Sequence, residues 1–270
     1  MKRSQPSLDS ALVAGSEALA SLRRYIVQEL ESAGLEARQQ PFTAQTPLGL
    51  REMVNITGVV QGTKPGIILL GNHYDTKYFE NQVFVGANDG GSTTAWMIEM
   101  ARALGPSRAG RTVYLCFFDG EEALVSWTSA DSLYGSRHYV ETLLAENKLD
   151  EIEAMINVDM IGDCDLRLPR DRNAPAWLTA AVWDEASRQG YASSFVTASQ
   201  SVQDDHIPFR DAGVPALELI DFNFGPLNSY WHTPADTIDK CCASSLQTVG
   251  NVLYHSLPLI DAQLDLAAPP

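Results

Sequence analysis

The chain has 270 residues, 45% hydrophobic and 20% charged, so it is long enough to bury a substantial core as one domain over residues 1–270. Its net charge of -15 at pH 7 argues against a nucleic-acid partner, because phosphate backbones select basic surfaces. No apolar stretch approaches the roughly 18 residues that a membrane span requires.

Helical and strand-like patterns alternate along the chain. In chain order they predict a helix from about Leu19 that stops at Gly34, strands at 54–60 and 66–71, a helix at 91–104, a strand at 111–118, a helix at 134–146, a strand at 153–159, a helix at 174–189, a strand at 214–220 and a helix near 243–257. This alternation predicts a three-layer α/β/α sandwich around a mostly parallel mixed central sheet. The connections at 119–133, 163–173 and 221–236 are long enough to be functional.

Acids and histidines follow several of the predicted strands. In open α/β sheets the ligand crevice lies beyond the carboxyl ends of the strands, so these residues are expected to converge there. Together they form a nitrogen and oxygen ligand set suited to zinc, without clustered thiolates. The set comprises His73, Asp89, Glu121, Glu122, Asp159 and His232.

Glu121 and Glu122 follow a strand-like run that ends at Gly120. Successive residues of a strand point opposite ways, so both glutamates can occupy one site only where the strand breaks into a loop. One carboxylate could then bind a metal while the other moves protons. Alternatively, both could be solvated residues that open a helix, and each neighbouring acid or histidine taken singly could be a capping, turn or loop residue.

The four cysteines show no metal-binding spacing. Cys116 lies in a strand pattern and is expected in the core, whereas Cys164 could pair with either Cys241 or Cys242. The opening residues Met1-Lys2-Arg3-Ser4 are basic but lack the apolar segment of a signal peptide.

Longer strings in the sequence resemble a known family. They are residues 73–79, 118–123 together with Trp127, 131–138, 204–209 and 231–233. The ligand order resembles the M28 family of zinc aminopeptidases, and the finer pattern is similar to its animal-type glutaminyl cyclases, the glutaminyl-peptide cyclotransferases.

The resemblance implies roles for individual residues. It implies one zinc per chain held by Asp89, Glu122 and His232, with Glu121 as the proton-transfer residue. Asp159 and Asp204 would join Glu121 in a catalytic carboxylate network. Trp127 and Trp231 would wall the substrate pocket, although both could instead be core aromatics. His73 and Asp159 could also contribute to a second metal site.

The implied activity converts the N-terminal glutamine of peptides or proteins to pyroglutamate with release of ammonia. A di-zinc M28 aminopeptidase is the alternative, and a non-catalytic scaffold is a second one, although such scaffolds usually lose ligands and none is lost here. A monomer is expected. Family analogy alone favours an extracytoplasmic location, periplasmic or secreted with the leader absent from this chain, over a cytoplasmic one.

Two departures from the animal pattern stand out. The disulfide that secreted animal cyclases carry near the active site has its counterparts here at Asn72 and Thr94, neither of which can form it. The loop from Asp221 to Tyr230 is longer than the animal one, so its Phe222 and Phe224 have no assigned counterpart.

Overall fold

The computed structural model describes residues 12–267, and the basic opening segment lies outside the described residues. Their main feature is a mixed six-stranded sheet with the order β1-β2-β4-β3-β5-β8. Its strands are β1 (Glu36–Thr46), β2 (Gly49–Val60), β3 (Lys64–His73), β4 (Arg111–Phe118), β5 (Ile152–Asp159) and β8 (Ala216–Ile220). β4, β3, β5 and β8 run parallel to one another, whereas β2 is antiparallel to both β1 and β4.

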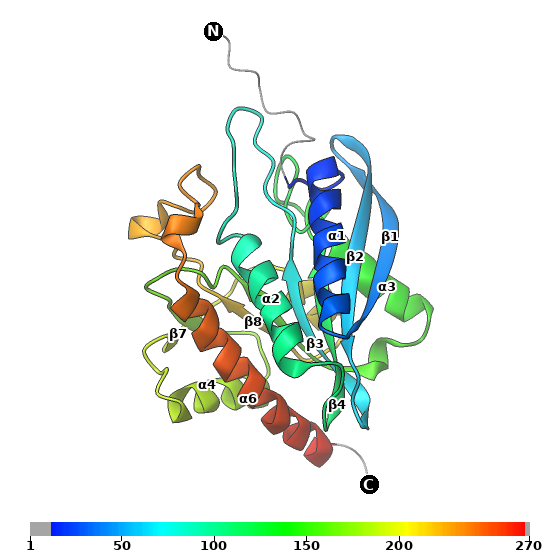
Figure 1. Cartoon of the computed structure of the whole chain (residues 1–270), viewed down its shortest axis with the longest axis vertical. Coiled ribbons are helices and arrows are strands. Elements are labelled where there is room, and N and C mark those ends of the chain that lie inside the picture. The colour runs from blue at the N-terminus through cyan, green and yellow to red at the C-terminus, as the bar shows by residue number, and fades with distance from the viewer. Residues whose placement is uncertain (1–11, 268–270) are drawn as a thin grey trace.

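Helices cover both faces of this sheet. Within the described residues they are α1 (Glu17–Ser32), α2 (Gly91–Leu104), α3 (Tyr134–Ala145), α4 (Ala176–Arg188), α5 (His206–Asp211) and α6 (Ala243–Ala267). α1, α2 and α6 lie in front of the sheet in Figure 1, with α4 packed against α6. α3 and α5 contact each other and the opposite face of the sheet. The predicted three-layer α/β sandwich is confirmed.

Alternation along the central strands builds two separate cores. In β4, Val113, Leu115 and Phe117 belong to the larger core under α1, α2, α4 and α6. Cys116 and Phe118, which point the other way, belong to the smaller core under α3 and α5. Successive strand residues face opposite sides of a sheet, so a strand buried on both faces reads as a continuous apolar run. Cys116 is buried, as expected.

Several elements differ from the sequence predictions. β1 falls in the polar stretch to which no strand was assigned, and it pairs with β2 over the whole length from Glu36–Val59 to Thr46–Gly49. It is an edge strand with mostly polar and partly exposed residues, so it lacks the apolar signal of a central strand. The second sheet, β6 (Leu168–Asp171) with β7 (Phe195–Gln200), and the short α5 were also missed.

The last helix is longer than predicted. A stop near residue 257 was expected, whereas α6 continues through Pro258 to Ala267. Asp261 in this extension accepts hydrogen bonds from the backbone N–H of Arg111 at 3.0 Å and from the guanidinium of Arg108 at 2.6 Å. These bonds anchor the extension to the start of β4, which offsets the cost of an interior proline.

A disulfide resolves the open choice among the cysteines. Cys164 pairs with Cys242, and Cys241 stays a free thiol. The bond links the loop after β5 to the residue before α6 and so closes 78 residues of chain. No helix among residues 12–267 is long and apolar enough to cross a membrane.

Candidate active site

The predicted site residues gather at the carboxyl ends of β3, β4 and β5. His73 is the last residue of β3 and pairs in register with Phe118, the last residue of β4. Asp159 ends β5. Because these strands are parallel, their ends meet at one edge of the sheet, where the crevice of an open α/β sheet lies.

Gly120 and Asp75 shape the chain around the two glutamates. Gly120 has a φ of 71°, and a β-carbon there would lie 2.8 Å from the sulfur of Met53, so this turn requires glycine. The next two N–H groups, of Glu121 and Glu122, donate to the two oxygens of Asp75 at 3.1 and 3.3 Å. In the sequence, Asp75 was noted only as a member of the motif at residues 73–79. Its position two residues after His73, at the end of a strand, was the signal that could have identified it as a site residue.

Asp89, Glu122 and His232 form the first of two candidate metal clusters, with ligand atoms within 4.8 Å of one another. His232 Nε2 lies 2.8 Å from Glu122 Oε1 and 3.1 Å from Asp89 Oδ2. Burial lowers the pKa of His232, but its contacts with Asp89 and Glu122 outweigh burial and raise that pKa to about 9. Asp89 Oδ2 and Glu122 Oε2 are buried without a hydrogen-bond partner among residues 12–267, and one nitrogen with two carboxylates suits zinc.

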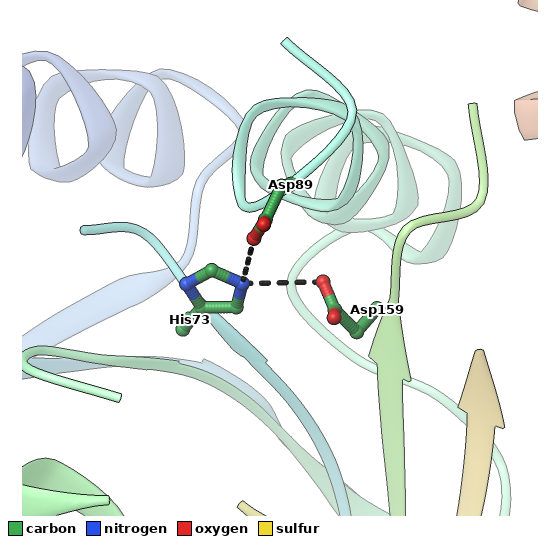
Figure 2. Close-up of side chains that lie close together, drawn as sticks. All are labelled: His73, Asp89 and Asp159. Atoms are coloured by element: carbon green, nitrogen blue, oxygen red, sulfur yellow. Dashed lines mark hydrogen bonds and ion pairs between the residues drawn. The ribbon is translucent and has the colours of Figure 1, made fainter. Parts of the chain in front are cut away.

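The second cluster shares Asp89 with the first. Figure 2 shows His73 Nε2 pointing between two carboxylates, at 3.3 Å from Asp89 Oδ1 and 3.1 Å from Asp159 Oδ1. The other ring nitrogen lies 3.1 Å from the carbonyl oxygen of Asp75. All three side chains of this cluster are buried, whereas His232 of the first cluster is partly exposed.

Asp236, which was not predicted as a site residue, connects the loop that carries His232 to the backbone of Asp89. Its carboxylate accepts hydrogen bonds from the backbone N–H groups of Asn88 at 2.7 Å and Asp89 at 3.2 Å. It lies four residues after His232, which itself has a positive φ of 53°. The loop that carries one ligand therefore orients the backbone of another.

A cavity of about 530 Å³ opens beside the first cluster and is lined by Glu121, Asp159 and Asp204. Burial raises the pKa of Glu121 well above its ordinary value; nearby His73 opposes this rise, and Asp204 adds to it. The Asn157 amide donates to Asp204 Oδ1 at 2.9 Å and to Glu218 Oε2 at 3.0 Å, which fixes the Asp204 side chain from behind.

Aromatic side chains flank this cavity. Trp127 and Trp231 both line it, and Trp127 is 39% exposed, so it is not a core residue. Trp231 stacks on His232 with ring centroids 4.1 Å apart and lies 4.8 Å from the ring of Phe222. Of the two unassigned phenylalanines, Phe222 lines the cavity, whereas Phe224 is fully buried.

Lys77 contributes a positive charge to the cavity that the sequence analysis left without a role. Its ammonium group donates to the carbonyl of Ala123 and lies 3.6 Å from Glu122 Oε2. Nearby, Asn72 Nδ2 donates to Thr94 Oγ1 at 3.2 Å. A hydrogen bond thus joins the two positions to which the resemblance assigned the missing disulfide.

Comparisons with known proteins agree with this geometry. The model of Peptidase family M28 matches residues 55–257, which include both metal clusters. The glutaminyl-peptide cyclotransferase of Bos taurus is 30% identical over 276 residues, covering 88% of this chain and 75% of that protein. The crystal structure of a glutaminyl cyclase from an Acidobacteriales bacterium has a TM-score of 0.88 at 36% identity, over 97% of this chain and 98% of its own.

The same fold occurs in a Zn-dependent exopeptidase from Parabacteroides distasonis. Its structure has a TM-score of 0.83 at 23% identity, over 93% of this chain and 92% of its own. This likeness concerns the fold alone. The side chains around the cavity, rather than the sheet and helices, therefore have to distinguish cyclisation from peptide hydrolysis.

Proposed function

This chain belongs to peptidase family M28 and, within it, to the glutaminyl-peptide cyclotransferases, and from that premise we propose how its residues act. The reaction converts an N-terminal glutamine to pyroglutamate with release of ammonia, which makes the protein an acyltransferase acting on peptide substrates. The roles are assigned from the two adjacent glutamates. Glu122 belongs to the candidate metal cluster, whereas Glu121 lines the cavity without belonging to that cluster.

Asp89, Glu122 and His232 would hold one zinc. Asp89 Oδ2 and Glu122 Oε2 have ion-pair contacts but accept no hydrogen bond within residues 12–267, and together with the exposed side of His232 this supports the choice over the buried cluster around His73. When bound there, zinc supplies Lewis-acid polarisation of the carbonyl of the substrate side-chain amide. Asp236 and Asp75 hold the backbone of Asp89 and Glu122, so these ligands are fixed from behind.

Glu121 moves the proton. The α-amine nitrogen of the substrate forms a bond to the side-chain amide carbon, and Glu121 accepts a proton from that nitrogen. Glu121 then gives the proton to the amide nitrogen, whose bond to carbon breaks as ammonia leaves. A carboxyl group with a raised pKa suits this exchange; burial keeps the pKa of Glu121 raised and Asp204 adds to the rise, while Asp159 lines the same cavity as the third carboxylate of the proposed network.

Trp127, Trp231 and Phe222 would surround the folded glutamine side chain. The attack is intramolecular, so holding the amine close to the amide supplies much of the rate gain by orientation. Aromatic walls around the bound side chain would also exclude water, which reduces competing hydrolysis.

The proposal includes one catalytic domain acting as a monomer. The cavity is lined by residues from Lys77 to His232, which supports one catalytic domain. The Cys164–Cys242 disulfide supports an extracytoplasmic location, because such bonds persist in oxidising compartments.

A di-zinc aminopeptidase is the competing candidate. The cluster of His73, Asp89 and Asp159 favours it, because it offers a second set of ligands that shares Asp89 with the first. Hydrolysis would need a water-derived nucleophile between two metals.

Mass spectrometry of a Gln-Phe-Ala peptide, incubated with zinc-loaded protein and compared with an enzyme-free sample, separates these candidates. A loss of roughly 17 mass units, the mass of ammonia, is expected for cyclisation. Release of free glutamine would instead identify an aminopeptidase, and an unchanged peptide would point to a scaffold without activity.

A further inference from the structure

The loop between β4 and α3 is closed at its base. The N–H of Leu133 donates to the carbonyl of Glu121 at 2.8 Å, and the N–H of Tyr134 donates to the carbonyl of Gly120 at 2.9 Å. Residues 121–133 therefore leave the sheet and return to the same point. One end of this loop carries Glu121 and Glu122, and its middle carries Trp127.

Asp131 organises the interior of this loop. Its Oδ1 accepts hydrogen bonds from the N–H of Leu124 at 3.0 Å and the hydroxyl of Tyr134 at 2.9 Å. Its Oδ2 accepts from the N–H groups of Val125 and Ser126, both at 2.9 Å. The residue is 3% exposed, and three consecutive backbone donors converge on one carboxylate. Burial would raise the pKa of Asp131, but these donors outweigh it and hold that pKa below its ordinary value.

Trp127 follows the last of these three backbone donors directly. Its indole is partly exposed and donates one hydrogen bond, from Nε1 to Gln203 Oε1 at 3.3 Å. Gln203 lines the same cavity and precedes Asp204 in the chain. Trp127 is 39% exposed, so the position of its indole should depend on the backbone of residues 124–126, which Asp131 fixes.

We propose that Asp131 is a positioning residue for the substrate pocket, which acts by holding Trp127 at the cavity that Trp231 also lines. The inference rests on the proposed function, because it assigns Trp127 to substrate binding. Asp131 would then determine substrate affinity without contacting the substrate. The string Asp131-Ser132-Leu133-Tyr134 thereby gains a physical role: an acid and a phenol that hold the same loop.

Asp131→Asn tests this role, because an amide places donors where three N–H groups need acceptors. We expect KM for Gln-Phe-Ala to rise roughly tenfold, as loss of charge-assisted hydrogen bonds allows the loop to open, while kcat and zinc content stay within about twofold. In a Trp127→Ala background the same substitution should leave KM unchanged, because it acts through Trp127. Tyr134→Phe, which removes one donor and keeps the carboxylate, should raise KM less and provides a milder variant if Asp131→Asn folds poorly.

Asp261→Asn is the matched control. Asp261 is also buried and also accepts a backbone N–H and an arginine, but at the opposite end of β4. The Asp261→Asn substitution should lower the melting temperature without changing KM for Gln-Phe-Ala.

Hydrogen exchange measures the loop independently of activity. In Asp131→Asn the amides of residues 124–126 should lose protection. Lost protection with an unchanged KM, or an equal rise in KM with and without Trp127, would overturn the role of Asp131. Failure of the wild-type protein to cyclise the peptide would instead refute the proposed function, and it is seen before any variant is made.

Discussion

Two adjacent glutamates have different surroundings because one aspartate holds the chain between them. Asp75 accepts the N–H groups of both Glu121 and Glu122, directly after a glycine with positive φ. Both side chains line the cavity, but only Glu122 belongs to the cluster with Asp89 and His232. Local backbone geometry would therefore separate the proposed metal ligand from the proposed proton-transfer residue.

Replacing Glu121 by glutamine should lower kcat by at least about 10²-fold, because the variant has no carboxylate to exchange the proton. Zinc content should stay at the wild-type level, since Glu121 is outside the metal cluster. Steady-state kinetics with metal analysis of the same sample would check both. Glu122→Gln is the control that should lose zinc, and a near-normal kcat in Glu121→Gln would remove its proposed role.

Replacing Trp231 by alanine should mainly raise KM. Its ring stacks on His232 and contacts Phe222 at the cavity, so truncation removes a wall rather than a core residue. Kinetics and a melting curve on the same variant distinguish the two roles. A large fall in melting temperature with unchanged kinetics would assign Trp231 to packing.

At the scale of elements, long loops carry the site and aspartates fix the loops. Asp236 joins the loop of His232 to the start of α2, and Asp131 organises the loop of Trp127. In both cases a buried carboxylate accepts consecutive backbone N–H groups. Loops anchored in this way can hold functional groups as firmly as strands do.

Asp236→Ala should weaken zinc binding roughly 10- to 100-fold, the range usual for residues that orient metal ligands. The backbone donors of Asn88 and Asp89 lose their acceptor, so Asp89 is no longer held against His232. Competition with a chelator of known affinity would measure the change. Asp239→Ala in the same loop, where the side chain is exposed and pairs with Lys240, should leave zinc affinity unchanged.

Sequence reasoning predicted those elements that have a strong apolar signal. The helix at 91–104 and the strand at 111–118 match the structure at both ends, because buried faces dictate their patterns. β1 escaped prediction because a polar edge strand resembles a loop, and α5 because six residues are too short to show a helical period. The role of Asp236 escaped because its partners are backbone groups, which leave no trace in the sequence; for Asp75, whose partners are also backbone groups, only its position near His73 at a strand end gave a signal.

At the scale of the whole molecule, three separate regions supply one cluster of ligands. Asp89 precedes α2, Glu122 follows β4, and His232 lies between β8 and α6. The sequence could indicate this convergence because the carboxyl ends of parallel strands share an edge. It could not give the pairing of Cys164 with Cys242, because adjacent cysteines offer two choices that only the fold decides.

Removal of zinc should lower the melting temperature. A ligand at 1,000 times its dissociation constant stabilises the native state by about 4 kcal/mol, which corresponds to roughly 8–16 °C for a chain of this size. Without metal, Asp89 and Glu122 also repel each other, and this repulsion raises the pKa of Glu122 after the larger effect of burial.

Melting curves with chelator, with excess zinc and with magnesium would check this expectation. His232→Ala should show no shift with chelator. The affinity should also weaken as pH falls below about 9, the pKa of His232 without metal, because protons then compete for its ring nitrogen. A shift of equal size in His232→Ala would place the stabilising metal elsewhere.

The order of the ligands along the chain has a consequence for biosynthesis. Asp89 and Glu122 leave the ribosome more than a hundred residues before His232, and Asp236, which orients Asp89, follows later still. A nascent chain therefore presents two acids without the third proposed ligand while the 110 residues from Glu122 to His232 are added. If these three residues hold the zinc as proposed, metal capture with full affinity would have to wait until His232 and Asp236 have been made and folded against Asp89, so we expect loading to follow synthesis of this region.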